Sequence, residues 1–206
     1  MSKDALIVAV AADRLSEKLR TSGFHIDEGP RMFDELSQAG LWLGPRWLLE
    51  ENDSFLQLIP YVVLRKGRQV ACYQRSASGN EGRLRGMRSI GLGGHIEIAD
   101  AVMAGPHIDP QQTIELASRR ELLEEVGDLV VVDQCWRGWI VDRDSPVGRV
   151  HLGLVGIWTV ENSSIHGAED AIADSALVDI VELSRDSAHL ESWSRMIIPM
   201  LLQDLG

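Results

Sequence analysis

The segment 119-RRELLEEVG-127 constrains the fold more than any other part of the sequence, because it predicts a helix with one crowded acidic side. We expect the helix to run over 111–126 and to stop at Gly127. At about 100° per residue, the glutamates of this segment fall within an arc of about 100°. They are Glu121, Glu124 and Glu125, and the apolar residues expected to face the core from the opposite side are Leu116, Leu122, Leu123 and Val126.

The three glutamates repel one another in this arrangement. Glu121 forms like-charge pairs with Glu124 and Glu125, each costing about 0.2–0.5 kcal/mol on an exposed helix. Carboxylates in the last turn also oppose the helix dipole. Arg120, about 40° from Glu124 around the helix, relieves part of the repulsion. A divalent cation relieves nearly all of it, since Mg²⁺ prefers oxygen ligands. A solvated acidic surface is the alternative, and it is the usual meaning of such a pattern.

Apolar runs on both sides of this helix predict an α/β fold. A hairpin is expected over 59–75 around Lys66 and Gly67, followed later by strands over 129–142 and 147–160. Other expected elements are a strand over 6–11, helices over 13–19, 32–38 and 187–202, and an apolar run over 176–183. Strands in series with two well-separated long helices predict a mixed sheet covered on both faces.

The composition argues against several classes of partner and indicates a compartment. The net charge of -11 argues against non-specific nucleic-acid binding, which depends on basic residues that neutralise phosphates. No apolar run reaches the roughly 18 residues of a membrane span, so no membrane partner is expected. The two cysteines form no CxxC pair, which fits a reducing compartment and predicts a cytoplasmic protein.

A second motif lies upstream of the acidic helix. The run 91-GLGGHIEIAD-100 ends an expected strand in glycines, where the lack of Cβ atoms lets the backbone approach a ligand. Together, Gly94, Asp100 and 120-RELLEEVG-127 resemble the signature of the Nudix hydrolase superfamily. Asp100 replaces the usual glutamate, and 12 additional residues lie between the two halves, around 101–112. The chain is thus similar to bacterial members of the predicted-phosphoesterase type, with an insertion inside the signature.

The resemblance implies a Nudix-type α/β/α sandwich with a mixed β-sheet over 56–206. Residues 1–55 lie outside it and are expected to form an N-terminal α/β extension that serves as a dimer arm, a lid over the substrate or a stabiliser. The insertion is expected to be a loop, and loops tolerate added length at a cost of about 0.6 kcal/mol per doubling. A homodimer is one expected assembly.

The resemblance also implies roles for individual residues. Glu121, Glu124 and Glu125 occupy positions that bind Mg²⁺ or Mn²⁺, with the carbonyl of Gly93 as a further ligand. Arg120 is expected to orient the glutamates and to pair with Asp100. Catalysis is assigned to Glu124, Glu125 and Arg120. Metal-activated water is the expected nucleophile. The general base is either a helix glutamate or a later acid, and Glu161, Glu169, Asp170 and Glu182 are equally available.

Substrate contacts are expected from residues around the glycine turn. His95 could touch a phosphate or be a polar turn residue with no catalytic role, and Glu97 could join the metal shell. Among the basic residues 75, 83, 85 and 88, we assign Arg75 and Arg88 to phosphate binding. Core packing is favoured over base stacking for Trp136, Trp139 and Trp158, and a structural role is favoured for His151 and Cys72.

The predicted function is divalent-metal-dependent hydrolysis of a diphosphate linkage in a small, nucleoside diphosphate-linked substrate. Two alternatives remain open. The same fold also supports allylic diphosphate isomerases, and it supports non-catalytic modules that sense nucleotides. Intact glutamates at the metal positions argue against the sensing module.

Overall fold

The computed structural model describes residues 4–27, 31–75, 86–162, 164–165, 167 and 172–205. Its main sheet is hydrogen-bonded in the order β11-β5-β4-β10-β9-β2, with β1 beside β3 and β4, and β6 beside β5. The strands are β1 (Leu6–Ala11), β2 (Gly23–Ile26), β3 (Leu41–Pro45), β4 (Phe55–Lys66), β5 (Gln69–Arg75), β6 (Arg88–Ser89), β7 (Met103–Ala104), β8 (His107–Ile108), β9 (Val131–Val141), β10 (His151–Val160) and β11 (Ile172–Asp179).

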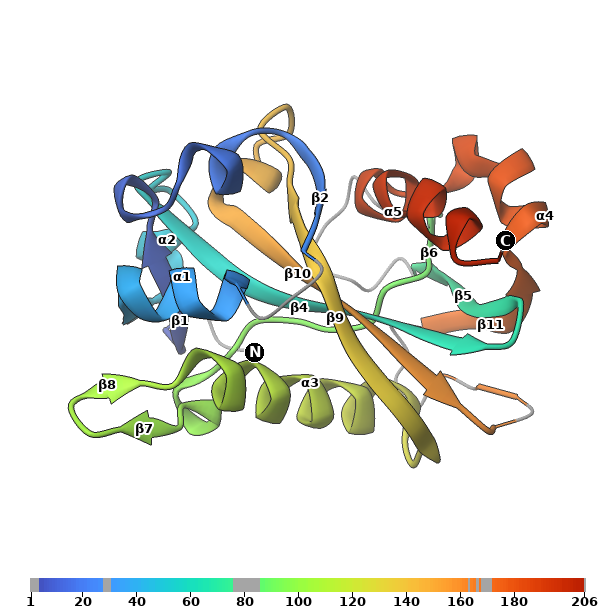
Figure 1. The fold of residues 1–206 in the computed structure, drawn as a ribbon, viewed down its shortest axis with the longest axis horizontal. Coiled ribbons are helices and arrows are strands. Elements are labelled where there is room, and N and C mark those ends of the chain that lie inside the picture. Colours follow the sequence, from blue (N-terminus) through green and yellow to red (C-terminus); the bar gives the residue numbers. More distant parts are fainter. Residues whose placement is uncertain are drawn as a thin grey trace. The chain divides into compact units, whose positions relative to one another are not determined.

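Five α-helices and several 3₁₀ turns complete the described part of the chain (Figure 1). The α-helices are α1 (Arg31–Ala39), α2 (Arg46–Leu49), α3 (Pro110–Val126), α4 (Ile180–Arg185) and α5 (Ser192–Gln203). The 3₁₀ turns are η1 (Ala12–Arg14), η2 (Glu17–Arg20), η3 (Ile98–Asp100), η4 (Gly148–Val150) and η5 (Ser187–His189). Within the described residues, no helix is long and apolar enough to cross a membrane.

The chain divides into two compact units. The first comprises Met1–Tyr61, Gly94–Arg119 and Trp136–Val155. The second comprises Val62–Gly93, Arg120–Cys135 and Gly156–Gly206. The predicted boundary between residues 55 and 56 stays a prediction.

The first unit has a core built from the N-terminal segment and from later strands. Strand β1 pairs antiparallel with β3 and β4, and β2 pairs antiparallel with β9. Buried side chains from these elements meet others from α1, α3 and β10; among them are Val8, Val10, Leu36, Leu56, Ile114, Trp139, Leu152 and Leu154. The short β7–β8 hairpin lies within the predicted insertion and leads directly into α3 (Figure 1).

The second unit has its own core. The β4–β5 hairpin turns at Lys66 and Gln69, and β5 also pairs antiparallel with β11 and β6. Its buried side chains include Val62, Leu64, Tyr73, Leu92, Leu122, Trp158 and Val160. Helices α4 and α5 follow β11 and contact each other (Figure 1).

Most long elements agree with the sequence predictions, and several short ones do not. The strand over 6–11, the 59–75 hairpin and the helix ending at Val126 are confirmed. The helix predicted over 13–19 is wrong, because this segment forms the 3₁₀ turns η1 and η2 separated at Leu15 and Ser16. The last helix begins at Ser192 rather than near Ser187, and the 176–183 run divides into the end of β11 and the start of α4.

Candidate active site

Helix α3 has clear start and stop signals. The carboxylate of Asp109 accepts a hydrogen bond from Gln112 N at 3.0 Å, and Pro110 occupies the first helical position. At the other end Gly127 adopts a φ of +73°, and its N–H donates to Leu123 O at 3.1 Å. Helices commonly end at a glycine in this left-handed conformation. The local sequence therefore fixes where the acidic turn ends.

The buried side of α3 differs from the predicted one. Leu122 is buried in the second core, but Leu116 and Leu123 are 45% and 58% exposed. Buried positions along the helix instead include Ile114, Ala117 and Glu121. The prediction that Leu116 and Leu123 face the core is therefore wrong. Of the three glutamates only Glu121 is buried, and its carboxylate is tolerated there because it accepts a hydrogen bond from Arg120.

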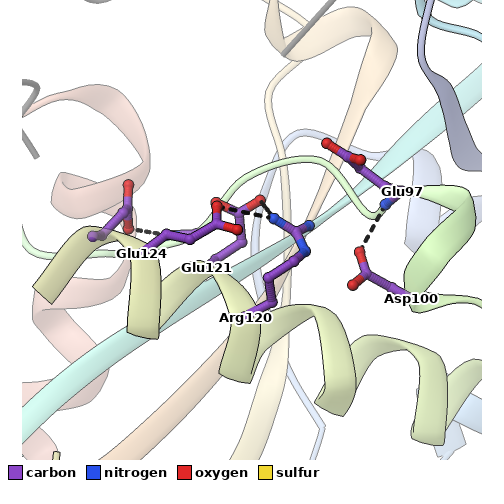
Figure 2. A network of polar contacts seen from close by, with 7 residues as sticks. Glu97, Asp100, Arg120, Glu121 and Glu124 are labelled. Carbon is purple, nitrogen blue, oxygen red and sulfur yellow. Dashed lines mark hydrogen bonds and ion pairs between the residues drawn. The ribbon is translucent and has the colours of Figure 1, made fainter. Parts of the chain in front are cut away.

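Arg120 holds two of the three glutamates (Figure 2). Its Nη1 atom lies 2.8 Å from Glu121 Oε1 and 3.3 Å from Glu124 Oε2. The Glu121 side chain is 11% exposed and the Glu124 side chain is 49% exposed. The pair with Glu121 is therefore the less screened of the two. One nitrogen thus bridges a buried carboxylate and a solvent-facing carboxylate.

Glu125 is held by the glycine turn. The Gly93 N–H donates to Glu125 Oε2 at 2.9 Å. Gly93 has a φ of +139°, a backbone conformation that side chains disfavour. The strand before the turn is fixed by paired bonds between Val62 and Leu92, at 2.8 and 2.9 Å, and Tyr73 Oη donates to Gly91 O at 2.8 Å. The turn therefore presents an N–H to the acidic helix, while the predicted metal role of the Gly93 carbonyl stays a prediction.

Gly93, Arg120, Glu121, Glu124 and Glu125 all belong to the second unit, so this part of the predicted site is brought together. In the described part of the chain, no three His, Cys, Asp or Glu side chains are arranged as a ready metal centre. The donor set itself suits a hard cation, since it offers carboxylate oxygens on successive helical turns. The structure shows these carboxylates held by N–H donors from Arg120 and Gly93.

Residues 95–100 form a polar segment of the first unit. Glu97 N–H donates to Asp100 Oδ2 at 2.8 Å, which caps η3 (Figure 2). Asp100 is buried, and its predicted pairing with Arg120 stays a prediction. His95 Nε2 lies 2.8 Å from Gln57 Oε1 and 3.2 Å from His151 Nε2. The sequence assigned a phosphate contact to His95 and gave no role to Gln57, a lone amide in an apolar strand.

Burial keeps both histidine rings neutral. It lowers the pKa of His95 to about 2, with smaller contributions from His151 and from the positive charge of Arg46. It also lowers the pKa of His151, against the hydrogen bond to Val147 O, which favours the charged ring. Neither ring therefore carries a positive charge for a phosphate at neutral pH.

The basic residues predicted to bind phosphate are only partly described. The Arg88 guanidinium lies 3.6 Å from Asp186 Oδ2, and the Arg88 carbonyl accepts from Glu191 N. Arg75 is placed by its backbone, which pairs with Ile172, while residues 83 and 85 lie outside the described residues. A phosphate role for Arg75 and Arg88 stays a prediction.

The remaining candidates separate into core and surface residues. Trp139 and Trp158 are buried in the two cores, and Trp136 packs edge-on against Phe33, which agrees with the packing role. Cys72 and His151 are also buried. Glu161 and Glu182 are exposed, whereas Glu169 and Asp170 lie outside the described residues. No general base is singled out by this placement.

Comparison with known proteins identifies the fold. No protein-family model matches the chain. Protein YmaB of Bacillus subtilis (strain 168) is 29% identical over 156 residues, which cover 74% of each chain. The crystal structure of the candidate Nudix hydrolase Tm1382 superposes with a TM-score of 0.78 at 26% identity, covering 96% of this chain and 98% of that chain. The chain has the Nudix hydrolase fold.

More distant structures share this Nudix fold. A Nudix hydrolase from Alicyclobacillus acidocaldarius matches with a TM-score of 0.54 at 11% identity, over 72% of this chain and 91% of that chain. The bifunctional NMN adenylyltransferase/ADP-ribose pyrophosphatase of Francisella tularensis was solved with AMP and a Mn ion. It matches at 17% identity with a TM-score of 0.50, over 73% of this chain and 42% of that chain. The predicted Nudix resemblance and α/β fold class are confirmed, and the similarity to Tm1382 supports the predicted enzyme class.

Proposed function

We propose that this protein hydrolyses a diphosphate linkage in a small phosphorylated substrate with the help of Mg²⁺ or Mn²⁺. The observation that carries the proposal is the gathering of Glu121, Glu124 and Glu125 by Arg120 and the Gly93 N–H at the end of α3. Nudix neighbours with matching folds, one of them an ADP-ribose pyrophosphatase solved with Mn, support the same chemistry.

The three glutamates would hold the cation. When bound, the metal neutralises charge on the diphosphate oxygens and makes bound water a stronger nucleophile. Glu121, largely buried, supplies a carboxylate with little freedom to turn away. Glu124 is half-exposed and therefore has room to exchange its Arg120 contact for a cation or a water molecule.

Arg120 and Gly93 act as positioning groups in this proposal. A positive guanidinium at 2.8 Å from Glu121 and 3.3 Å from Glu124 offsets the repulsion between the two carboxylates. The Gly93 N–H fixes one oxygen of Glu125. Arg120 and Gly93 thus hold the three carboxylates in place at the end of α3.

The decisive experiment is a hydrolysis screen of nucleoside diphosphate derivatives with Mg²⁺ or Mn²⁺, using wild type and Glu124→Gln in parallel. We expect the substitution to lower kcat/KM by about 100-fold or more, because it removes a charged ligand. Glu115→Gln is the matched control on the same helix, since Glu115 bonds Gln111 rather than Arg120. Equal turnover by wild type and Glu124→Gln would overturn the assignment.

The screen also separates the alternatives. An allylic diphosphate isomerase moves a double bond and releases no phosphate, so product analysis by NMR distinguishes it from a hydrolase. A sensing module binds nucleotides without turnover in either metal. Phosphate or nucleotide release that requires Glu124 supports hydrolysis alone.

A further inference from the structure

The cluster of Gln57, His95 and His151 lies in the first unit and contains none of the α3 carboxylates. Gln57 is fully buried on β4, and His151 is buried at the start of β10. His151 Nε2 and Gln57 Oε1 both lie within hydrogen-bond distance of one atom, His95 Nε2. The proposed hydrolytic chemistry uses none of these contacts.

The protonation of His151 follows from its backbone contact. His151 Nδ1 lies 2.7 Å from Val147 O, and a carbonyl oxygen can only accept, so Nδ1 carries the proton. The other nitrogen of a neutral ring, Nε2, then presents a lone pair to His95. A ring N–H donated to a backbone carbonyl is also the usual way in which a metal-binding histidine is oriented.

At His95 Nε2, two acceptors compete for one hydrogen. If His95 Nε2 is protonated, its single hydrogen must serve both the Gln57 oxygen and the His151 lone pair. If the Gln57 amide is turned so that its nitrogen donates to His95 Nε2, two imidazole lone pairs face each other at 3.2 Å. Each arrangement of these protons therefore leaves either one hydrogen shared by two acceptors or two lone pairs that face each other.

We propose that His95 Nε2, His151 Nε2 and Gln57 Oε1 form a binding site for a borderline divalent cation such as Zn²⁺. A cation satisfies all three lone pairs at once, and imidazole nitrogens favour zinc over magnesium. For His95 to bind through Nε2, its proton moves to Nδ1, so the ring remains neutral. The charged groups acting on the rings are Arg46 and Glu50, which are bonded to each other at 2.7 Å. The positive charge of Arg46 is therefore already offset near the site.

The test uses untagged full-length protein in which Glu121, Glu124 and Glu125 are changed to glutamine, which removes the predicted carboxylate site. After treatment with a chelator, Co²⁺ is titrated and followed by its visible absorption, and Zn²⁺ is titrated by calorimetry. We expect about one equivalent to bind with a Kd well below 1 mM. Absence of binding up to about 1 mM of either metal would overturn the proposal.

Substitutions in the same background identify the ligands. We expect His151→Gln to weaken Zn²⁺ binding at least about tenfold, and Gln57→Glu to strengthen it by a similar factor, because a carboxylate replaces a neutral oxygen. The control is His107→Gln on the exposed β8 hairpin, which should bind as the parent does. Because Gln57→Glu moves the affinity in the opposite direction, poor folding cannot imitate the expected result.

A direct measurement needs no substitution at the cluster. Ring-nitrogen NMR spectra of the parent protein should show the Nε2 resonances of His95 and His151 shifting on addition of Zn²⁺, while Nδ1 of His151 stays protonated. Zinc bound with both Nε2 resonances unmoved, or zinc affinity retained in His151→Gln, would place the metal elsewhere and contradict the site.

Discussion

At the scale of single residues, one nitrogen of Arg120 contacts two carboxylates. Nη1 lies 2.8 Å from Glu121 and 3.3 Å from Glu124. Arg120→Ala should therefore remove a positive charge shared by two adjacent carboxylates and lower kcat/KM by about 10–100-fold. Arg120→Lys should recover most of this loss, since a single ammonium nitrogen can make both contacts. Steady-state kinetics at several Mg²⁺ concentrations measures both effects, and alanine and lysine variants with equal activity would contradict the bridging role.

The two cysteines are expected to differ sharply in reactivity. Burial raises the pKa of the Cys72 thiol, and the nearby Arg88 guanidinium opposes this only in part. Cys135 is exposed on β9. Since the thiolate is the reactive form, an alkylating reagent at about pH 8 should modify Cys135 and spare Cys72 until the chain is unfolded. Intact-mass spectrometry with and without denaturant provides the measurement, and rapid modification of Cys72 in the native protein would contradict its buried position.

At the scale of elements, α3 separates two neighbouring leucines. Leu122 is 3% exposed in the second core, whereas Leu123 is 58% exposed. Leu122→Ala should destabilise the protein by about 2–5 kcal/mol, because it leaves a cavity. Leu123→Ala should change stability by less than about 0.5 kcal/mol, as surface substitutions usually do. Urea unfolding of both variants makes the comparison, and similar losses would mean that the helix is turned as the sequence predicted.

Helix α3 shows how much of the structure can be predicted from the sequence. Its span and its acidic cluster were predictable, because Gly127 stops the helix and three glutamates crowd one arc. Its orientation was not, because a hydrophobic pattern assigns leucines to the core and cannot anticipate that the Gly93 N–H supplies a partner for Glu125. The helix prediction around Leu15 and Ser16 is wrong for a related reason. Tertiary packing overrides the local helical preference there, and only 3₁₀ turns form.

The β7–β8 hairpin and the role of Gln57 could not be predicted from the sequence either. Strands of two residues carry no periodicity, and the glycine and prolines of 101–112 predict only a loop. Gln57 can be assigned a role only because it lies in a cluster with His95 and His151, which are 38 residues and more away along the chain. Contacts of this kind depend on the fold and leave no local pattern.

At the scale of the whole molecule, the predicted homodimer can be tested on the exposed apolar side chains of residues 1–55. Trp42 and Trp47 are 57% and 50% exposed, and among the described strands β3 pairs only with β1. Exposed apolar side chains beside an open strand edge favour association. For a dimer formed through this segment, Trp42→Glu combined with Trp47→Glu should halve the mass measured by light scattering. A dimer that survives both changes would refute the dimer-arm role.

Deleting residues 1–55 would not test that role, because the segment supplies core side chains. Val8, Val10, Leu19, Met32 and Leu36 pack in one core with side chains from α3, β9 and β10. Burying each such side chain contributes about 1.5–3 kcal/mol, against a net stability of about 5–15 kcal/mol for a native protein. We therefore expect the truncated chain to lose cooperative unfolding and to aggregate, as measured by circular dichroism and light scattering. A soluble, cooperatively folding 56–206 fragment would instead establish the N-terminal segment as a separable extension.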